Sequence, residues 1–503
     1  MKSLSITVLV FVLLIFTSVN SSANEFGSET CSKAIEFQGK IYFCGKSARL
    51  GYELFKSDGT RNGAALFLDI NSGPLSSKPS SFFILKNTLY FIAQTNNSGR
   101  QIWRTDGTQS GTTQVTNQRF DSTPFSINSS EIMGVDVIYF KNPAGDWWRT
   151  DGSSRGTNKL GNLGSVMGTI GDYLYFVKET IAEAPSLFRI AEDALEPELV
   201  RVLDFSFAQS CFLTGSGAYA DISTNPFLQN KFRNNLYINV ICDDTQKDLV
   251  IVSDGTASGT RVLFEGIGRL IGDTNLNRYF SLTDFSGQST IQFTNGSITR
   301  ALGLCAQTAD CRSGNNTGIS LLNSGRFIFG LREGRSARPY VWASDGTIQG
   351  TQRLMKGRTS TNKQLSTVIN NRLVFSLEDE SLPHTPQVWQ TDGTQVNTQL
   401  LQEFKPGVII GVFSLGRTIL VFHSDQATQR TSVWASREFN TPLRLIQGFD
   451  NHRLDLQGAV AIEGGLYFKV NGNLWRTDGT RPGTHSLINT ITMSPIINLL
   501  VDE

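Results

Sequence analysis

Residues 473–484 read Asn-Leu-Trp-Arg-Thr-Asp-Gly-Thr-Arg-Pro-Gly-Thr, and the same phrase returns along the whole chain. Its pattern is an aromatic residue, any residue, Ser or Thr, Asp-Gly-Thr, two variable residues and Gly-Thr. Close copies start at Trp103, Trp148, Trp342 and Trp389, and copies with a weaker aromatic position cover 55–63 and 251–260. Repetition of this kind is typical of a protein assembled from similar structural units.

The phrase predicts a β-hairpin with an ordered loop. Alternating apolar residues ahead of Asp-Gly indicate a strand that enters a tight turn. The Asp carboxylate can accept a backbone N–H two residues further on, and the Gly beside it supplies a positive φ. We expect the second Gly to be left-handed too, and Asn397, its one replacement, fits because Asn tolerates that region. These second glycines are Gly63, Gly111, Gly156, Gly259, Gly350 and Gly483.

Seven carboxylates recur at the Asp-Gly position: Asp58, Asp106, Asp151, Asp254, Asp345, Asp392 and Asp478. Calcium binding or catalysis is one interpretation of this set. We favour a structural turn, because each Asp stands where its side chain can hydrogen-bond the backbone of its own loop.

The aromatic position is occupied by six tryptophans: Trp103, Trp148, Trp342, Trp389, Trp434 and Trp475. Stacking against a carbohydrate is the functional interpretation. Packing between neighbouring units is favoured, because one unit of a repeat protein cannot bury its apolar faces alone.

A second phrase, a turn residue followed by Leu-Tyr-Phe or a relative, precedes each hairpin. It ends at Phe43, Phe91, Phe140, Phe176, Ile238, Phe280, Phe329, Phe375, Phe422 and Phe468. Degraded hairpin phrases at 187–190, 293–296 and 433–436 fill the gaps between the seven intact ones, so both phrases indicate ten units. Units of this length with four short strands are typical of propeller blades. We therefore predict an all-β fold, a β-propeller-like array of about ten four-stranded units.

Ten blades exceed the usual range of about four to eight, and two five-bladed rings would also fit the count. One continuous array is favoured, because the step of 42 residues from the fifth unit to the sixth leaves no room for a linker. Residues 494–500 read like a first strand, and we expect them to close the array beside residues 34–37.

The repeated phrase resembles that of the ELWxxDGT repeat family of bacterial secreted proteins. The residues that carry the likeness include 53–60, Glu-Leu-Phe-Lys-Ser-Asp-Gly-Thr, and 473–480. The likeness extends over nearly the whole chain after the first 23 residues. It implies a repetitive, propeller-like body and no catalytic activity. A weaker likeness to the Asp-box turn of sialidase propellers differs in placing the aromatic residue before the turn.

Residues 1–23 read as a signal peptide, with Lys2, an apolar run over 4–16 and the small residues Ser21, Ser22 and Ala23. An uncleaved anchor is disfavoured because the run is short for a bilayer. We expect a repeat domain over 24–503 that is secreted, periplasmic or at the cell surface, with no transmembrane span after cleavage. The chain has 45 basic and 44 acidic residues, which argues against nucleic-acid binding.

The six cysteines, an even number in an exported chain, indicate disulfides. Proximity in the sequence favours the pairs Cys31–Cys44, Cys211–Cys242 and Cys305–Cys311, although fifteen pairings are formally possible. The four histidines are scattered and no Cys-x-x-Cys occurs, so we expect no metal site and no cofactor.

The step of 62 residues between the fourth and fifth units contains an insertion over about 205–241. We expect it to lie between blades, held by Cys211 and Cys242. Binding loops on rigid scaffolds are common, so Phe212, Tyr219 and Phe227 are candidate partner-binding residues. A disulfide-held loop without a function is the alternative.

The chain lacks the nucleophile-elbow, zinc-protease, P-loop and EF-hand motifs, and no catalytic residue is assigned. The favoured function is a non-catalytic recognition or adhesion module that binds a protein or glycan. The alternative is a secreted glycan hydrolase or lyase at the channel mouth. Three or more carboxylates that converge with an Arg would favour the alternative, and a bare mouth would favour recognition. A structural envelope protein without a ligand is the third hypothesis.

Overall fold

The structure is a computed structural model that describes residues 34–487. Gaps in the description fall at 48, 118–131, 134–136, 143, 181–182, 204–210, 215–230, 233, 243–248, 266, 274–277, 284–288, 296–298, 302–319, 323, 333–338, 346, 348, 360–364, 379–384, 439–440, 451–453 and 472. The described residues form β-strands and turns without an α-helix. Within this part of the chain, therefore, no helix could cross a membrane.

The strands form ten antiparallel sheets, which we number in chain order. Sheet 1 contains β1 (Ile35–Phe37), β2 (Lys40–Ser47), β3 (Gly51–Ser57) and β4 (Ala64–Leu68). Sheet 2 contains β5 (Ser80–Leu85), β6 (Thr88–Thr95), β7 (Gly99–Thr105) and β8 (Thr113–Gln114). Sheet 3 contains β9 (Ile132–Met133), β10 (Ile138–Lys141), β11 (Trp147–Thr150) and β12 (Asn158–Gly161). Sheet 4 contains β13 (Ser165–Ile170), β14 (Tyr173–Thr180), β15 (Glu183–Ala191) and β16 (Glu198–Val202). Sheet 5 contains β17 (Cys211–Thr214), β18 (Lys231–Phe232), β19 (Asn235–Cys242), β20 (Leu249–Ser253) and β21 (Arg261–Glu265).

The second half of the chain repeats this arrangement. Sheet 6 contains β22 (Ile267–Asp273), β23 (Arg278–Thr283), β24 (Ser289–Thr294) and β25 (Thr299–Ala301). Sheet 7 contains β26 (Ser320–Leu321), β27 (Phe327–Arg332), β28 (Pro339–Ser344) and β29 (Gln352–Lys356). Sheet 8 contains β30 (Arg358–Thr359), β31 (Ser366–Ile369), β32 (Arg372–Glu378), β33 (Gln387–Thr391) and β34 (Gln399–Glu403). Sheet 9 contains β35 (Gly407–Leu415), β36 (Thr418–Asp425), β37 (Arg430–Ser436) and β38 (Arg444–Asp450), and sheet 10 contains β39 (Leu454–Ile462), β40 (Gly465–Val470), β41 (Asn473–Thr477) and β42 (His485–Ser486).

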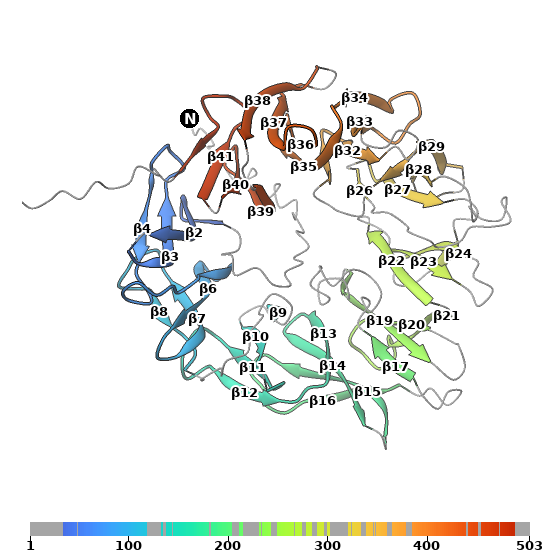
Figure 1. Cartoon of the computed structure of the whole chain (residues 1–503). Helices are drawn as coiled ribbons and strands as arrows, with labels where there is room; N and C mark the ends of the chain where they lie inside the picture. The colour runs from blue at the N-terminus through green and yellow to red at the C-terminus, as the bar shows by residue number, and fades with distance from the viewer. Residues whose placement is uncertain are drawn as a thin grey trace, which may run out of the picture.

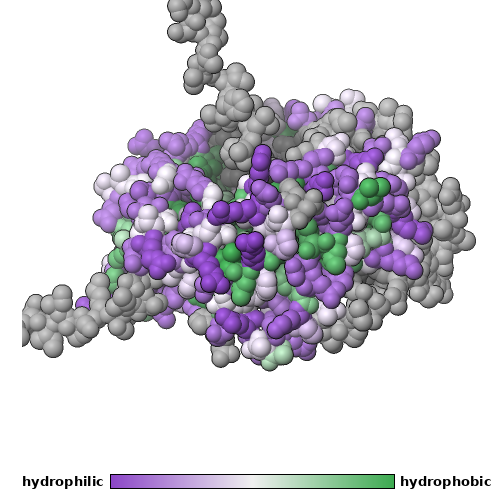
Figure 2. Space-filling view, turned by 90° about the horizontal axis from the view of Figure 1, so that it is seen from above, coloured by the Kyte–Doolittle hydropathy of each residue, from purple (hydrophilic) through white to green (hydrophobic). Residues whose placement is uncertain are grey.

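The sheets follow one another around a circle, with first strands such as β9, β13 and β39 towards its centre and fourth strands such as β12 and β16 outside (Figure 1). Polar residues predominate on the face in Figure 2, and apolar residues form small separate patches there. Each Leu-Tyr-Phe-type phrase lies on the second strand of one sheet, and each Asp-Gly loop joins a third strand to a fourth.

Two-residue turns connect the first two strands in six of the sheets. In sheets 1, 2, 8 and 10 both turn residues have a positive φ, as in Gln38-Gly39 and Glu463-Gly464. In sheets 4 and 9 only the first does, and it is Gly171 or Gly416. These conformations match the right-handed twist of paired strands, so local sequence determines the first hairpin in these six sheets.

A β-bulge interrupts the third and fourth strands immediately before the aromatic position in seven sheets. In sheet 1, for example, Leu54 pairs with Leu68 but Phe55 pairs with Leu66, which leaves Phe67 as the extra residue. The extra residue is apolar every time: Phe67, Leu160, Val200, Leu263, Leu354, Leu401 and Ile446. A bulge that inserts an apolar side chain at one fixed level is a designed feature of the repeat.

The hydrophobic core is divided among the interfaces between neighbouring sheets. The aromatic residue packs on the preceding sheet, as Trp475 does against Phe449 of sheet 9. The bulge residue packs on the following sheet, as Phe67 does in the cluster with Phe91 of sheet 2. Sheet 10 packs on sheet 1 in the same manner, in a cluster that joins Tyr467 to Phe55. Sheets 1 to 4 and 8 to 10 therefore each bury apolar side chains against two neighbours.

The insertion between the fourth and fifth units differs from our expectation. Residues 211–214 and 231–232 form β17 and β18, and both pair with β19. The stretch thus supplies first-strand segments of sheet 5 instead of lying wholly between sheets. Sheet 8 is built likewise, because β30 and β31 both pair with β32.

Candidate functional site

The Asp-Gly loops share one hydrogen-bond pattern, for which the loop at Asp478 is representative. Asp478 Oδ1 accepts the backbone N–H of Thr480 at 2.9 Å and its hydroxyl at 2.7 Å. The Thr477 hydroxyl accepts the Gly479 N–H at 3.1 Å and lies 2.7 Å from the Thr484 hydroxyl. All seven carboxylates accept such a pair of hydrogen bonds. One carboxylate oxygen of every Asp is therefore engaged within its own loop.

The second Gly of the phrase corrects our expectation. Six first glycines have a positive φ, including Gly59 and Gly479, but none of the six second glycines does. The second Gly is small for a steric reason, since a Cβ on Gly483 would lie 2.0 Å from Asp478 Oδ1. The other five positions have a similar clash of 1.9–2.1 Å. Contact with the carboxylate, and not backbone conformation, selects glycine here.

Asn397 shows how a side chain can be accommodated at this position. Its Nδ2 donates a hydrogen bond of 2.7 Å to Asp392 Oδ2, while Oδ1 keeps its bonds to Thr394. The amide thus replaces an unfavourable contact with a favourable bond to a charged acceptor. Asn does not occupy this position because of a left-handed backbone, as we had inferred.

The first Gly of the loop is the contact point between neighbouring sheets. The Tyr42 hydroxyl of sheet 1 donates to the Gly107 carbonyl of sheet 2 at 3.4 Å, and Tyr175 of sheet 4 donates to Gly255 of sheet 5 at 3.5 Å. A Cβ on Gly59 would lie 2.9 Å from the hydroxyl of Tyr467, so sheets 10 and 1 meet through the same pair of groups.

Most of the tryptophans at the aromatic position pack between neighbouring sheets. Trp103, Trp148, Trp389, Trp434 and Trp475 all lie against the buried clusters between sheets. Trp342 lies under the guanidinium of Arg353, 5.4 Å from the ring centroid. This arrangement leaves these rings poorly placed for stacking on a sugar.

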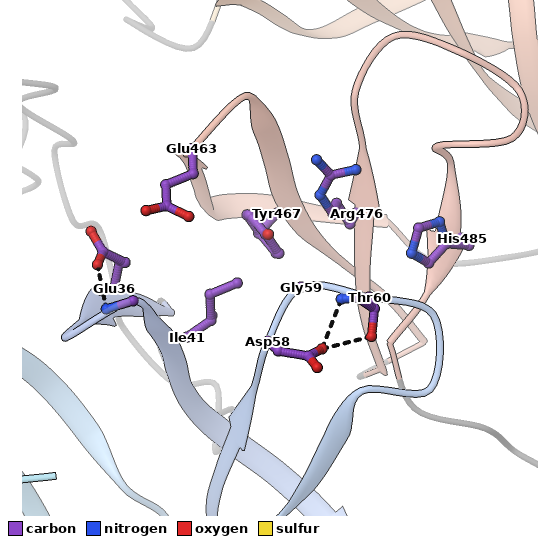
Figure 3. A pocket seen from close by; sticks show the side chains of 10 residues that line it. Glu36, Ile41, Asp58, Gly59, Thr60, Glu463, Tyr467, Arg476 and His485 are labelled. Atoms are coloured by element: carbon purple, nitrogen blue, oxygen red, sulfur yellow. Dashed lines mark hydrogen bonds between the residues drawn. The ribbon is translucent and has the colours of Figure 1, made fainter.

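A cleft of about 390 Å³ opens at the seam between sheets 10 and 1 (Figure 3). Its lining residues are Glu36, Gly39, Ile41, Asp58, Gly59, Thr60, Glu463, Tyr467, Arg476 and His485. In Figure 3, the side chains of Glu463, Tyr467 and Arg476 from sheet 10 face those of Ile41 and Asp58 from sheet 1. The size falls within the range of small-molecule sites.

The three carboxylates of the cleft differ in their engagement. Asp58 Oδ1 holds the backbone N–H and hydroxyl of Thr60, and Glu36 Oε1 accepts the Gly39 N–H at 3.0 Å. Hydrogen bonds from Thr60 hold the pKa of Asp58 below its ordinary value. Glu463 is exposed and has no hydrogen-bond or ion-pair partner among the described residues. Only Glu463 therefore presents both carboxylate oxygens to the cleft.

The imidazole of His485 is the second group without a partner. Both ring nitrogens are buried and neither makes a hydrogen bond of ordinary geometry, although the Pro482 carbonyl is near enough to act on the ring and raise its pKa. Burial and the charges of Arg61 and Arg476 lower the pKa of His485, so the ring is neutral at pH 7. Arg476 itself lies 3.9 Å from Asp478 Oδ2. A buried polar group without a partner is uncommon and requires an explanation.

Glu463 is the only carboxylate at its position among the aligned turns, whereas the position of His485 varies widely among the units. The turn position of Glu463 is occupied by Gln38, Lys86, Gly171, Asn370 and Gly416 in other sheets, so no other carboxylate stands there among these six turns. Glu463 has a φ of 40°, an unusual conformation for Glu. His485 stands opposite Arg476, at a position that other units fill with Ala65, Thr113, Asn158, Glu198, Arg261, Gln352, Gln399 and Arg444. Sequence analysis assigned neither residue, although the departure of Glu463 from the other turns is visible once the units are aligned.

The other candidate residues are only partly described. Cys44 on β2 is in a disulfide bond, but Cys31, Cys305 and Cys311 lie outside the described residues. Cys211 and Cys242 are paired directly across β17 and β19, a placement within the Cα spacing of disulfides. The three pairings remain predictions.

The candidate loop is also described only in part. Phe212 pairs through its backbone with Ile241, while Tyr219 and Phe227 lie outside the description, as do the signal peptide and residues 494–500. The described residues contain no group of three potential metal ligands.

The sheets and their packing define a propeller-like all-β protein. No family model matches the sequence, and no curated protein matches it. Among solved structures, the chain is similar to the tricorn protease, with 10% identity and a TM-score of 0.29 over 93% of this chain and 54% of that chain. It thus spans about half of the length of that chain.

Two further structures show a similar degree of likeness. BamB from Moraxella catarrhalis has 10% identity and a TM-score of 0.33, over 70% of this chain and 96% of that chain. The computationally designed Ika8 protein has 12% identity and a TM-score of 0.32, over 70% and 94%. Matches at these scores carry no information about activity.

Proposed function

We propose that the ten sheets are the blades of one closed propeller, and that the protein is an exported recognition module which binds a protein or glycan partner at the seam of sheets 10 and 1. Two contacts support a single ring. Strand β22 of sheet 6 lies beside β19 and β20 of sheet 5, and the cluster of Phe55 and Tyr467 joins sheet 10 to sheet 1. Two five-bladed rings would instead require sheet 5 to pack on sheet 1.

The observation that carries the binding function is the pair of uncommitted groups in the seam cleft. Glu463 has no partner among the described residues and is the only carboxylate at the first position of the six aligned turns, and neither ring nitrogen of His485 makes a hydrogen bond of ordinary geometry. Residues that the fold does not need and that stand on a rigid scaffold are typical of binding sites. The likeness of the repeated phrase to secreted ELWxxDGT proteins supports an exported, non-catalytic role.

A glycan hydrolase is the second candidate, because the cleft does gather three carboxylates with Arg476. It is less favoured, since Asp58 and Glu36 each hold a turn of the backbone. Glycosidases need one carboxyl as an acid and another as a base or nucleophile, so Glu36 and Glu463 would be the pair.

Binding is tested with the full chain, labelled and applied to a printed glycan array and to blotted envelope proteins. We expect a defined signal that the double substitution Glu463→Gln with His485→Ala abolishes, and that deletion of residues 212–230 leaves unchanged. A signal that only the deletion removes would place the site on the insertion instead. Turnover of fluorogenic glycosides that disappears in both Glu36→Gln and Glu463→Gln would establish the hydrolase, and absence of any binding would refute the recognition module.

A further inference from the structure

The charges around the seam cleft have mixed signs, with an excess of carboxylates. Three carboxylates and one guanidinium line it, and its neutral imidazole adds no charge. Lys40 and Arg61 lie close enough to act on Asp58 and His485, respectively, as does Asp478 on His485. A ligand with a full positive charge would be repelled by Arg476, and a ligand with a full negative charge would be repelled by the carboxylates. The excess of carboxylates therefore disfavours anions, and the guanidinium of Arg476 opposes a simple cation.

The hydrogen-bonding groups of the cleft are complementary to hydroxyl groups. Glu463 offers two acceptor oxygens, and the second oxygens of Glu36 and Asp58 are not used by their turns. Arg476 offers donors, and neutral His485 offers one donor and one acceptor. A hydroxyl group both donates and accepts, so it can satisfy either nitrogen of the imidazole and a carboxylate in turn.

Gly465 provides the space for the guanidinium of Arg476. A Cβ on Gly465 would lie 2.6 Å from Arg476 Nε, so glycine lets this side chain lie across β40. The corresponding residue of sheet 1 is Lys40, which pairs with Phe37 as Gly465 pairs with Ile462. The seam of sheets 1 and 2 is filled differently, because a Cβ on Gly107 would lie 2.7 Å from Gln38 Oε1.

We infer that the seam cleft binds a neutral saccharide unit, with Glu463 and His485 as the principal hydrogen-bonding residues. This inference rests on the proposed recognition function and assigns the class of ligand. The volume of about 390 Å³ suits a ligand of one or two sugar rings. Buried Tyr467, at 3% exposure, leaves no aromatic platform, so recognition depends on hydrogen bonds and affinity for a single unit is low.

The test is saturation-transfer NMR and calorimetric titration of the full chain with methyl glycosides of glucose, galactose and N-acetylglucosamine, and with lysine, glycine and inorganic phosphate as non-saccharide probes. At least one glycoside should bind, and Glu463→Gln and His485→Ala should each weaken it about tenfold or more. Gln38→Ala is the matched control, because Gln38 has the corresponding turn position at the next seam, and it should stay within twofold.

Each outcome separates this inference from the proposed function. Binding of lysine, glycine or phosphate in place of every glycoside would overturn the saccharide assignment. A glycoside that binds equally to parent, Glu463→Gln and His485→Ala would overturn the site while leaving a recognition function intact. Circular dichroism and melting temperatures that match the parent confirm that the variants are folded. The saccharide assignment would also be overturned if the chain captured a protein ligand on the envelope blot but bound none of these probes.

Discussion

Glu53 is the buried charge on which the connection between sheets 1 and 2 depends. Its side chain is 0% exposed and accepts four hydrogen bonds. The donors are the N–H groups of Ile70 at 2.8 Å, Asn71 at 3.4 Å and Ser77 at 2.7 Å, and the Ser77 hydroxyl at 2.6 Å. Glu53→Ala would leave these buried donors without an acceptor.

The expected loss of stability follows from the three hydrogen bonds of 2.8 Å or shorter. Each bond to a charged acceptor contributes about 1.5 kcal/mol or more, and each orphaned donor costs about 1–3 kcal/mol. Burial raises the pKa of Glu53, against the effect of its hydrogen bonds, so removal of the charge also relieves a desolvation cost. We expect Glu53→Ala to lower the free energy of unfolding by about 3 kcal/mol.

Gln101 provides the control, because it has the same position in sheet 2 and is also 0% exposed. Gln101 Oε1 accepts the Thr116 hydroxyl at 2.6 Å, but the side chain is neutral. Gln101→Ala should therefore cost less, about 1–2 kcal/mol. Urea unfolding followed by Trp fluorescence and circular dichroism measures both, and hydrogen exchange over residues 69–78 reports the local effect. A loss below about 1 kcal/mol, or one no larger than that of Gln101→Ala, would refute the reasoning.

Three further predictions concern the Asp-Gly loops and one buried histidine. Asp345→Ala should cost about 1 kcal/mol, because the bonds to Thr347 are lost, and an unchanged melting temperature would contradict a capping role. Burial acts to raise the pKa of Asp345, but hydrogen bonds from Thr347 and the charge of Arg326 hold it below its ordinary value, so this stabilisation should disappear as the pH falls through that lowered pKa. Gly483→Ala should lower the free energy of unfolding by about 1–2 kcal/mol through the clash with Asp478. Gly483→Asn should cost less, because Asn397 bonds the carboxylate from the same position. Urea unfolding in which the Asn variant is less stable than the Ala variant would count against this. Burial lowers the pKa of His423, which is 3% exposed, although the Lys405 carbonyl and Asp425 oppose it. As the pH falls, the unfolded chain therefore takes up the proton before the folded chain, so the free energy of unfolding should decrease at pH values below about 6.5. His423→Phe should reduce this decrease between pH 7 and 5. Identical pH profiles for the variant and the parent would refute this assignment.

Local rules within one unit were enough to predict most of the strands. Two-residue turns such as Gln38-Gly39 and the Asp-Gly loops are short-range signals, because each depends on the φ preferences and hydrogen bonds of adjacent residues. The alternation of apolar residues then placed Phe43 and its counterparts on second strands. The same short-range view failed at Gly483, because its constraint is a contact with Asp478 and not its own backbone.

Sequence by itself therefore determined the repeat, the all-β class and the position of each hairpin. Only the tertiary structure decided which side chains the sheets bury between them. The bulge that turns Phe67 towards sheet 2 has no local signature, since it is stabilised by a cluster that a neighbouring unit completes. The seam cleft depends on residues that are far apart in the sequence. Glu36 and Glu463 come from opposite ends of the chain, and both line the cleft only because sheet 10 packs on sheet 1.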